Sequence, residues 1–250
     1  MSMHKNNRQK LILEQINALG KVYSKSLASD LKVSEDTIRR DFNELSKNGL
    51  LKKVHGGAES VKQKLYYYND NVILNNDKKE IIAKKASSLL QDGMVLLISG
   101  GTTNLAFARL LPENLQATVY TYCLPIAMEL THYPNIDLFF IGGKIEKRAM
   151  VTIGVDVISK ISTLKADICF LGTGSIDQDG VSEESYEVSC IKRALINSSE
   201  QVVSLVTSDK INVRQSHHIC TLSELNGLVT DLDPSDEKLS IFTDSKVTLL

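Results

Sequence analysis

The sequence predicts two domains, a small winged helix-turn-helix domain followed by a larger α/β domain with a largely parallel sheet. Residues 34–42, Ser-Glu-Asp-Thr-Ile-Arg-Arg-Asp-Phe, have the pattern of the second helix of a helix-turn-helix. From residue 77 onward, short apolar runs alternate with helical segments, which is typical of parallel strands buried on both faces. At 250 residues the chain has room for both domains.

The recognition helix is predicted from its start signal and its apolar period. Ser34 can cap the free N–H groups of a helix, and Val33 and Ile38 have the spacing of a hydrophobic staple. Ile38, Phe42 and Leu45 recur at i, i+4 and i+7 and form one apolar stripe. The opposite side of the helix is therefore expected to face solvent or a partner.

This polar side is predicted to read DNA. Arginine suits guanine edges or phosphates, whereas hydroxyl and amide groups suit adenine or the backbone. The residues of this helix and its cap that we assign to DNA are Ser34, Thr37, Arg39, Arg40, Asn43 and Lys47. An ordinary amphipathic surface helix would also carry paired arginines, so the neighbouring segments decide between the two interpretations.

The neighbouring segments complete a winged helix. Apolar residues at helical spacing predict a first helix over residues 8–19, and Ser24 is expected to cap a short second helix. After the recognition helix, residues 50–54 have the composition of a strand and lead into a glycine turn. This turn contains His55 and Gly56, which we also assign to DNA, and it ends a domain of residues 1–58.

Charge separates the two parts of the chain. Residues 1–60 hold 11 lysines and arginines against 7 acidic residues, whereas the remaining 190 residues hold 18 against 23. A positive N-terminal domain suits the phosphate backbone, whose neutralisation supplies most of the sequence-independent affinity for duplex DNA.

Composition predicts a soluble, cytoplasmic protein without a metal site. The four cysteines are far apart and form no Cys-x-x-Cys pair, so we expect free thiols. No apolar run approaches the 18 residues that a membrane span needs, and the N-terminus leads into a charged helix rather than an export signal. We expect no contact with a membrane.

Residues 59–76 lack a clean period and are the expected linker, and residues 77–250 form the expected α/β domain. Strands are predicted over residues 94–98, 117–121, 137–141, 167–171, 201–206 and 227–230. Ligands of such sheets bind at the carboxyl ends of the strands, so the loops that follow the strands are the candidate ligand site.

Small polar loops follow several of these strands. The segment 99–103, Ser-Gly-Gly-Thr-Thr, opens a helix, and its glycines, N–H groups and hydroxyls can surround an anion. It matches neither a Walker loop nor the GxGxxG fingerprint, so neither a nucleoside triphosphate nor NAD is indicated. The residues that we assign to the ligand are Ser99, Gly100, Gly101, Thr102, Thr103, Gly142, Gly143, Lys144, Thr173, Gly174 and Lys210. Candidate acceptors for sugar hydroxyls are Asp209, Glu183 and Glu184.

Together these motifs resemble the DeoR family of bacterial sugar-metabolism repressors. The likeness rests on residues 34–42, the glycine wing, and the sensor segments 99–103, 124–127, 141–144 and 192–194. The resemblance implies a sensor domain with a ribose-5-phosphate isomerase-like fold, and a phosphorylated sugar as effector with no further cofactor. It also implies a homo-oligomer, dimer or tetramer, on operator DNA and repression of an operon for sugar uptake and breakdown.

Three segments depart from the family pattern. Ser99 replaces the usual aspartate before Gly-Thr-Thr, Tyr122 replaces a common asparagine, and residues 206–212 are a loose version of Ala-Asp-Ser-Ser-Lys-Phe-Gly. Tyr122 would fill space where an amide normally meets the sugar. The ligand is therefore expected to be smaller, differently oriented or atypical.

Two classes of function remain open, a ligand-gated transcription factor and a sugar-phosphate isomerase-like enzyme with an accessory DNA-binding domain. Isomerisation needs a carboxylate that moves a proton next to a carbonyl. Ser99 removes one such acid, although Asp209, Glu183 and Glu184 remain. The sequence favours the regulator, which is not an enzyme.

Overall fold

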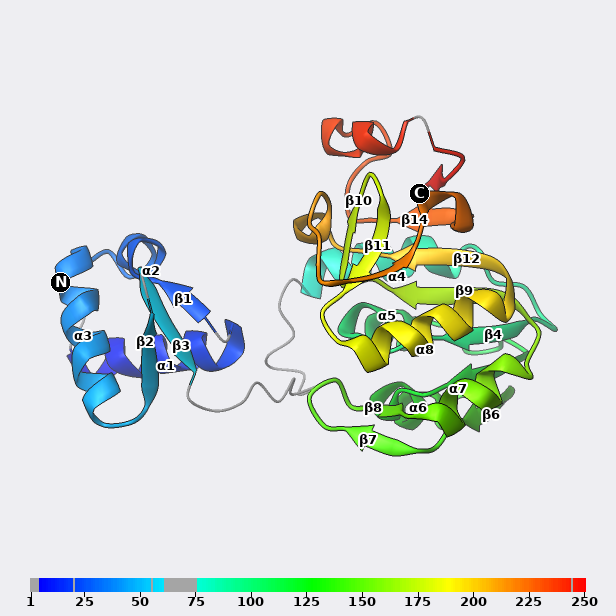
Figure 1. Ribbon diagram of the computed structural model, residues 1–250, viewed down its shortest axis with the longest axis horizontal. Coiled ribbons are helices and arrows are strands. Elements are labelled where there is room, and N and C mark those ends of the chain that lie inside the picture. The colour runs from blue at the N-terminus through cyan, green and yellow to red at the C-terminus, as the bar shows by residue number, and fades with distance from the viewer. Residues whose placement is uncertain (1–4, 20, 55, 61–75, 244) are drawn as a thin grey trace. The chain divides into compact units, whose positions relative to one another are not determined.

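The computed structural model describes residues 5–19, 21–54, 56–60, 76–243 and 245–250 (Figure 1). The chain divides into two compact units, residues 1–74 and 75–250, and each is described by itself. His55, which the sequence assigns to DNA contact, lies outside the described residues.

The N-terminal unit is a winged helix, as predicted. Its elements are α1 (Lys5–Leu19), β1 (Lys21–Tyr23), α2 (Ser24–Asp30), α3 (Glu35–Lys47), β2 (Leu51–Val54) and β3 (Gly57–Ser60). The three strands form an antiparallel sheet in the order β1-β3-β2. Glu59 and Ser60, which were expected to begin the linker, pair with Lys52 and Leu51 in this sheet. The wing therefore extends beyond residue 58.

The apolar stripe of α3 builds the core of this unit. Ile38, Phe42 and Leu45 are buried, as their spacing predicted, and Val33 packs against the same cluster. They pack with buried residues of the other helices and of the sheet, including Ile12, Ile16, Val22, Leu27, Leu51 and Ala58. The core thus fixes which side of α3 remains exposed.

The expected cap of the second helix is wrong. Ser24 is the first residue of α2, Tyr23 holds the N-cap position, and no side chain caps this helix. The Ser24 hydroxyl instead donates to Glu35 Oε1 at 2.7 Å, and lies 3.2 Å from the Gly56 carbonyl oxygen. The hydroxyl of this buried residue therefore links α2 to α3 and to the wing, a tertiary role that local spacing does not reveal.

The second unit is an α/β domain. Its elements are α4 (Asn76–Ser87), β4 (Val95–Ile98), α5 (Thr102–Ala108), β5 (Ala117–Thr121), α6 (Leu124–Leu130), β6 (Ile136–Phe140), β7 (Lys144–Glu146), β8 (Val151–Ile153), α7 (Val155–Ser162), β9 (Ala166–Gly172), β10 (Ser175–Asp177), β11 (Gly180–Glu183), α8 (Tyr186–Asn197), β12 (Ser199–Leu205), η2 (Ser208–Lys210), β13 (His217–Cys220), η3 (Leu222–Glu224), β14 (Gly227–Val229), η4 (Glu237–Phe242) and β15 (Thr248–Leu249). No described helix is long and apolar enough to cross a bilayer.

The main sheet has seven strands, all parallel, in the order β15-β14-β12-β9-β4-β5-β6. From β4 the chain first moves outward to β5 and β6, and it then returns to the other side of β4 to form β9, β12 and β14. Helix α5 packs with both α4 and α6, whereas α7 packs with α8. This is expected when right-handed crossovers toward the two edges of the sheet place their helices on opposite faces.

This reversal places a topological switch point between β4 and β9. In open parallel sheets the loops at the carboxyl ends of two such strands diverge and leave a crevice that binds ligands. The segments concerned are residues 99–103 after β4, of which Thr102 and Thr103 already begin α5, and residues 173–174 after β9. A small antiparallel sheet, β10-β11-β13, follows β9 directly (Figure 1).

Candidate DNA-reading face and effector crevice

The polar side of α3 starts at a formed N-cap. Ser34 has extended backbone, and its hydroxyl oxygen accepts from the Thr37 amide at 3.2 Å. The Ser34 and Thr37 hydroxyls lie 2.8 Å apart, so these two predicted DNA contacts also hold the helix start in place. At the other end Asn48 is the C-cap, and Gly49 follows with φ +69°.

The exposed side chains of α3 differ in whether they already have a hydrogen-bond or ion-pair partner within the protein. Arg39, Arg40, Asn43 and Lys47 are all exposed. Arg39 pairs with Glu35 at 2.8 Å, and this carboxylate also accepts from Ser24, which together lower the pKa of Glu35. Arg40 makes no hydrogen bond or ion pair with any described residue. Arg40 is therefore the better placed of the two arginines for a phosphate or a guanine edge.

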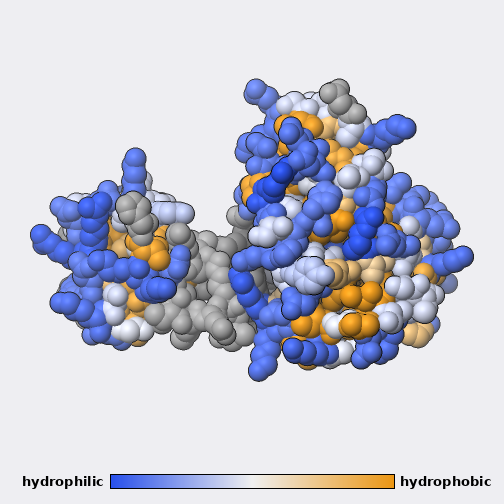
Figure 2. Space-filling view, in the orientation of Figure 1, coloured by the Kyte–Doolittle hydropathy of each residue, from blue (hydrophilic) through white to orange (hydrophobic). Residues whose placement is uncertain are grey.

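The wing contributes lysines that the motif did not include. Lys53 on β2 donates from Nζ to Asn43 Oδ1 on α3, and Lys52 and Lys53 are both exposed. Gly56 in the wing turn has φ +73°, a conformation that favours glycine. Figure 2 shows mostly hydrophilic side chains on the viewed face of this unit.

A buried ion pair fixes α3 against α1. The Arg8 guanidinium donates to both carboxylate oxygens of Asp41, at 2.6 and 3.2 Å, and Gln9 donates to the same carboxylate at 3.2 Å. The side chains of Arg8 and Asp41 are only 9% and 3% exposed. Asp41 lies between the exposed Arg40 and the buried Phe42, so this pair helps to set which side of α3 faces outward.

In the second unit, Ser99 joins the two strands of the switch point. Ser99 is fully buried, and its hydroxyl oxygen accepts from the Gly172 amide at 2.7 Å. Asn104 donates from Nδ2 to the carbonyls of Ser99 and Phe170, at 2.7 and 2.8 Å. The Ser99 hydroxyl is thus engaged in a hydrogen bond to the backbone of β9. Gly101 and Thr102, by contrast, are half-exposed.

Three lysines gather at the carboxyl ends of β9, β11 and β12. Lys192 of α8 is 4% exposed and forms an ion pair with Glu183 of β11. Lys210 donates to the Thr173 carbonyl at 3.3 Å, and burial together with Lys192 lowers its pKa. Burial and the nearby Lys210 lower the pKa of Lys79 on α4 to about 8. This lysine cluster, Lys79, Lys192 and Lys210, has Glu183 and Asp209 as its nearby acids, so lysines exceed carboxylates and an anion would be attracted to it.

The cluster is held by a second polar network. The Ser208 amide and hydroxyl both donate to Asp231, each at 2.7 Å, and Lys78 donates to Ser208 Oγ at 2.6 Å. These bonds fix the short helix η2, which carries Lys210. The sequence pointed to Lys192 only as a family landmark and missed Lys79, because neither follows a strand.

Other predicted ligand residues lie further along the sheet. Gly143 packs tightly on α7, since a Cβ added there would lie 2.7 Å from Val157 Cγ2. Lys144 begins β7 and is exposed, and among the described residues no hydrogen bond or ion pair joins it to the lysine cluster. Of the candidate acceptors, Glu184 is exposed and pairs with Arg148, whereas Glu183 lies at the cluster.

Tyr122 directly follows β5 and is completely buried. Its hydroxyl has no hydrogen-bond partner among the residues described, and burial raises its pKa. The Tyr122 carbonyl accepts from the Thr152 amide at 2.9 Å, which ties this residue to β8. The side chain therefore lies in the interior of this domain, and its effect on a ligand stays a prediction.

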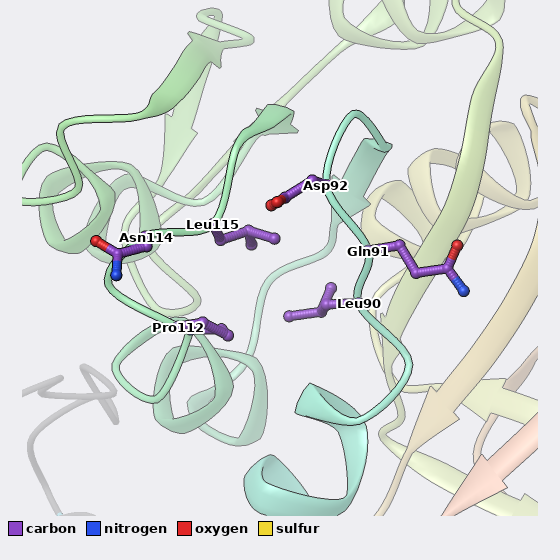
Figure 3. A pocket seen from close by; sticks show the side chains of 6 residues that line it. All are labelled: Leu90, Gln91, Asp92, Pro112, Asn114 and Leu115. Atoms are coloured by element: carbon purple, nitrogen blue, oxygen red, sulfur yellow. The ribbon is translucent and has the colours of Figure 1, made fainter.

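A surface hollow of about 280 Å³ lies at the opposite, amino ends of β4 and β5. Leu90, Pro112 and Leu115 line it, whereas the Gln91 side chain points away (Figure 3). Asp92 already accepts from the Gln116 amide at 2.9 Å. This hollow offers no group of charges comparable with the lysine cluster.

A winged helix with an exposed arginine, joined to an α/β domain with a lysine cluster near its switch point, is the arrangement expected of a ligand-responsive DNA-binding protein. The DeoR-like helix-turn-helix domain matches residues 8–64, and the DeoR C terminal sensor domain matches residues 74–232. The chain belongs to the DeoR family and is a DNA-binding transcriptional regulator.

Relatives span almost the whole chain. The HTH-type transcriptional repressor GlcR of Bacillus subtilis is 28% identical, covering 99% of this chain and 96% of its own. The glycerol-3-phosphate regulon repressor of Escherichia coli is 29% identical, covering 99% of each. Among solved structures, ribose 5-phosphate isomerase A of Methanocaldococcus jannaschii matches 54% of each chain, with 21% identity and a TM-score of 0.41. A similarity this low carries no argument about activity.

Proposed function

We propose that the protein represses an operon for sugar uptake or catabolism and that a phosphorylated sugar, bound but not converted, changes its affinity for operator DNA. The observation that carries this proposal is the lysine cluster at the switch point of a domain that shares its chain with a winged helix. Repressors of sugar-related genes are among its relatives, including the lactose phosphotransferase system repressor of Staphylococcus epidermidis. We further propose that it acts in the cytoplasm as a homo-oligomer, dimer or tetramer.

The state of Glu183 supports a regulator over an isomerase. Burial alone would raise its pKa, but the ion pair with Lys192 outweighs this effect and lowers it. A carboxylate held ionised by a buried lysine is a weak general base at neutral pH. Ser99 supplies no acid, and its hydroxyl is occupied by Gly172. Incubation with candidate sugar phosphates should therefore leave them unchanged, and detection of an isomerised product would favour the enzyme.

The DNA-reading side is tested by replacing the two arginines separately. Arg40→Ala should weaken binding to an operator, selected from random duplexes by the wild-type protein, by about 1–3 kcal/mol if Arg40 reads a base. Arg39→Ala is the matched control, since Arg39 already pairs with Glu35, and it should cost less. Fluorescence anisotropy with the selected and a scrambled duplex measures both variants.

The comparison of duplexes also assigns the role of Arg40. A loss confined to the selected duplex indicates base reading, whereas an equal loss on both duplexes indicates a phosphate contact. Unchanged affinity of Arg40→Ala for both duplexes would contradict the assignment of this side of α3 to DNA.

The effector crevice is tested by removing one charge from the lysine cluster. Lys210→Met should abolish release of the operator by the sugar phosphate that releases the wild type, because an attractive charge for the phosphate is lost. Stability should not fall, since Lys210 lies buried beside another lysine. Lys144→Met is the matched control and should respond like the wild type, because Lys144 is exposed and has no hydrogen bond or ion pair with a cluster residue among the described residues. The opposite pattern would place the phosphate beside Lys144.

A further inference from the structure

We infer that Gln215 and Glu183 form a hydroxyl-recognising subsite beside the lysine cluster, which selects a phosphorylated polyol or sugar over a bare phosphate. This inference rests on the proposed function. It assigns to Gln215, which lies in the loop between η2 and β13, a role that its sequence context does not indicate.

Gly174 shows how closely the two side chains converge. A Cβ added at Gly174 would lie 2.8 Å from Gln215 Oε1 and 3.1 Å from Glu183 Oε2. Both oxygens therefore face the same small volume next to the loop that follows β9. The neighbouring residue Thr173 provides the carbonyl to which Lys210 donates, so this volume adjoins the lysine cluster.

The oxygen of Gln215 lacks a donor. Gln215 Oε1 is buried and has no hydrogen-bond partner among the described residues. Two other buried polar atoms share this condition, Asn104 Oδ1 and the Tyr122 hydroxyl, but both belong to completely buried side chains. Gln215 as a whole is only half-buried, so its side chain borders the surface, and a ligand would contact Oε1 by displacing the groups that now enclose it. A buried acceptor without a donor is costly, which favours a ligand that supplies one.

The loop that carries Gln215 is anchored on both sides. The Gln215 amide donates to Ser182 Oγ at 2.9 Å, and the Ser182 hydroxyl lies 2.8 Å from the Ser175 hydroxyl. The adjacent Arg214 pairs with Asp177 at 2.7 Å and also with Asp179. These contacts fix the backbone of Gln215 against the β10-β11 hairpin, so its side chain is presented from a defined position.

The chemistry of the two groups defines the ligand. Glu183 already accepts from Lys192 and from the Glu184 amide, and its lowered pKa keeps it an ionised acceptor. Gln215 Oε1 is also an acceptor, so the volume between them suits hydroxyl donors. The negative charge of Glu183 repels a phosphate, which the lysine cluster attracts. The fitting ligand therefore carries a phosphate at one end and hydroxyls at the other.

The test compares three probes that differ in their hydroxyls, namely inorganic phosphate, propyl phosphate and glycerol 3-phosphate. Calorimetry on the full chain should give glycerol 3-phosphate a Kd about tenfold lower than that of propyl phosphate, as expected for hydrogen bonds that include a charged acceptor. Gln215→Met should remove this preference and leave the affinity for inorganic phosphate unchanged. Gln91→Met, at an exposed position on the opposite side of the sheet, is the control and should behave like the wild type.

The outcomes separate this inference from the proposed function. Equal affinities of the wild type for glycerol 3-phosphate and propyl phosphate, or a preference that survives in Gln215→Met, would overturn the subsite alone. A Gln215→Met variant that melts at a lower temperature but retains the preference would show that the amide serves only the fold. Failure of the wild type to bind any of the three probes would overturn the phosphate site and the proposed effector with it.

Discussion

Replacement of Asp41 by alanine should destabilise the N-terminal unit by about 3–5 kcal/mol, because it leaves the Arg8 guanidinium buried without its counter-ion. Both side chains are almost fully buried, and the pair includes two hydrogen bonds. Denaturant unfolding of the full chain should show an earlier transition for the N-terminal unit and an unchanged transition for the α/β domain. Operator binding should fall in parallel, since the pair orients α3.

A control for this variant lies on the same two helices. Glu44 of α3 pairs with Lys5 of α1 at 2.6 Å, but both side chains are about half-exposed, at 45% and 52%. Glu44→Ala should therefore change stability little, as is usual for ion pairs in water. The double replacement Arg8→Met and Asp41→Leu should recover much of the lost stability. Equal effects of Asp41→Ala and Glu44→Ala would show that burial of the pair contributes nothing.

Replacement of Gly172 by alanine should destabilise the α/β domain by about 1–3 kcal/mol or more, as overpacking does in a close-packed interior. The added Cβ would lie 2.2 Å from the Gly100 carbonyl oxygen, so backbone must move at the point where β9 meets the 99–103 loop. The Ser99 bond to the Gly172 amide would be disturbed as well. Thermal unfolding should show the loss, and operator binding in the absence of effector should persist.

Gly142→Ala is the control for this variant. Nothing lies within 4 Å of a Cβ added at Gly142, and its φ is not in the left-handed region. Both glycines lie near the carboxyl ends of strands, yet only Gly172 packs directly against the backbone that follows a neighbouring strand. A Gly172→Ala variant as stable as Gly142→Ala would show that the ends of β4 and β9 can separate without cost.

The sequence predicts the main sheet better than the segments around it. Strands such as β4 and β9 can be predicted because their nearly continuous apolar residues reflect burial on both faces. The strands β1 and β13 have only three and four residues, and each pairs with a strand that is distant in the chain, β3 and β11 respectively. The same limit explains Ser24, whose hydroxyl bonds to Glu35 and Gly56 rather than to its own helix.

A residue's position after a strand predicts that it lies in a loop at the sheet edge. It does not predict which side chains from other elements lie next to that loop. Lys210 and Thr173 follow strands, and the structure joins them through one hydrogen bond. Lys79 and Lys192 come from helices, and Gln215 comes from an irregular segment, so only the folded chain brings them to the same edge. Lys144 has the expected position after a strand, but it continues into the β7-β8 hairpin.

The bond between Lys53 and Asn43 has a consequence for how this protein would recognise a base. Bidentate reading of adenine requires both the oxygen and the nitrogen of an asparagine amide, and Lys53 already donates to this oxygen. On a bound duplex, Lys53 would have to exchange Asn43 for a phosphate before the amide could serve an adenine. The wing would then bind the DNA backbone in the same step that frees Asn43 to read a base. Sequence recognition would therefore depend on the contact between the wing and a phosphate.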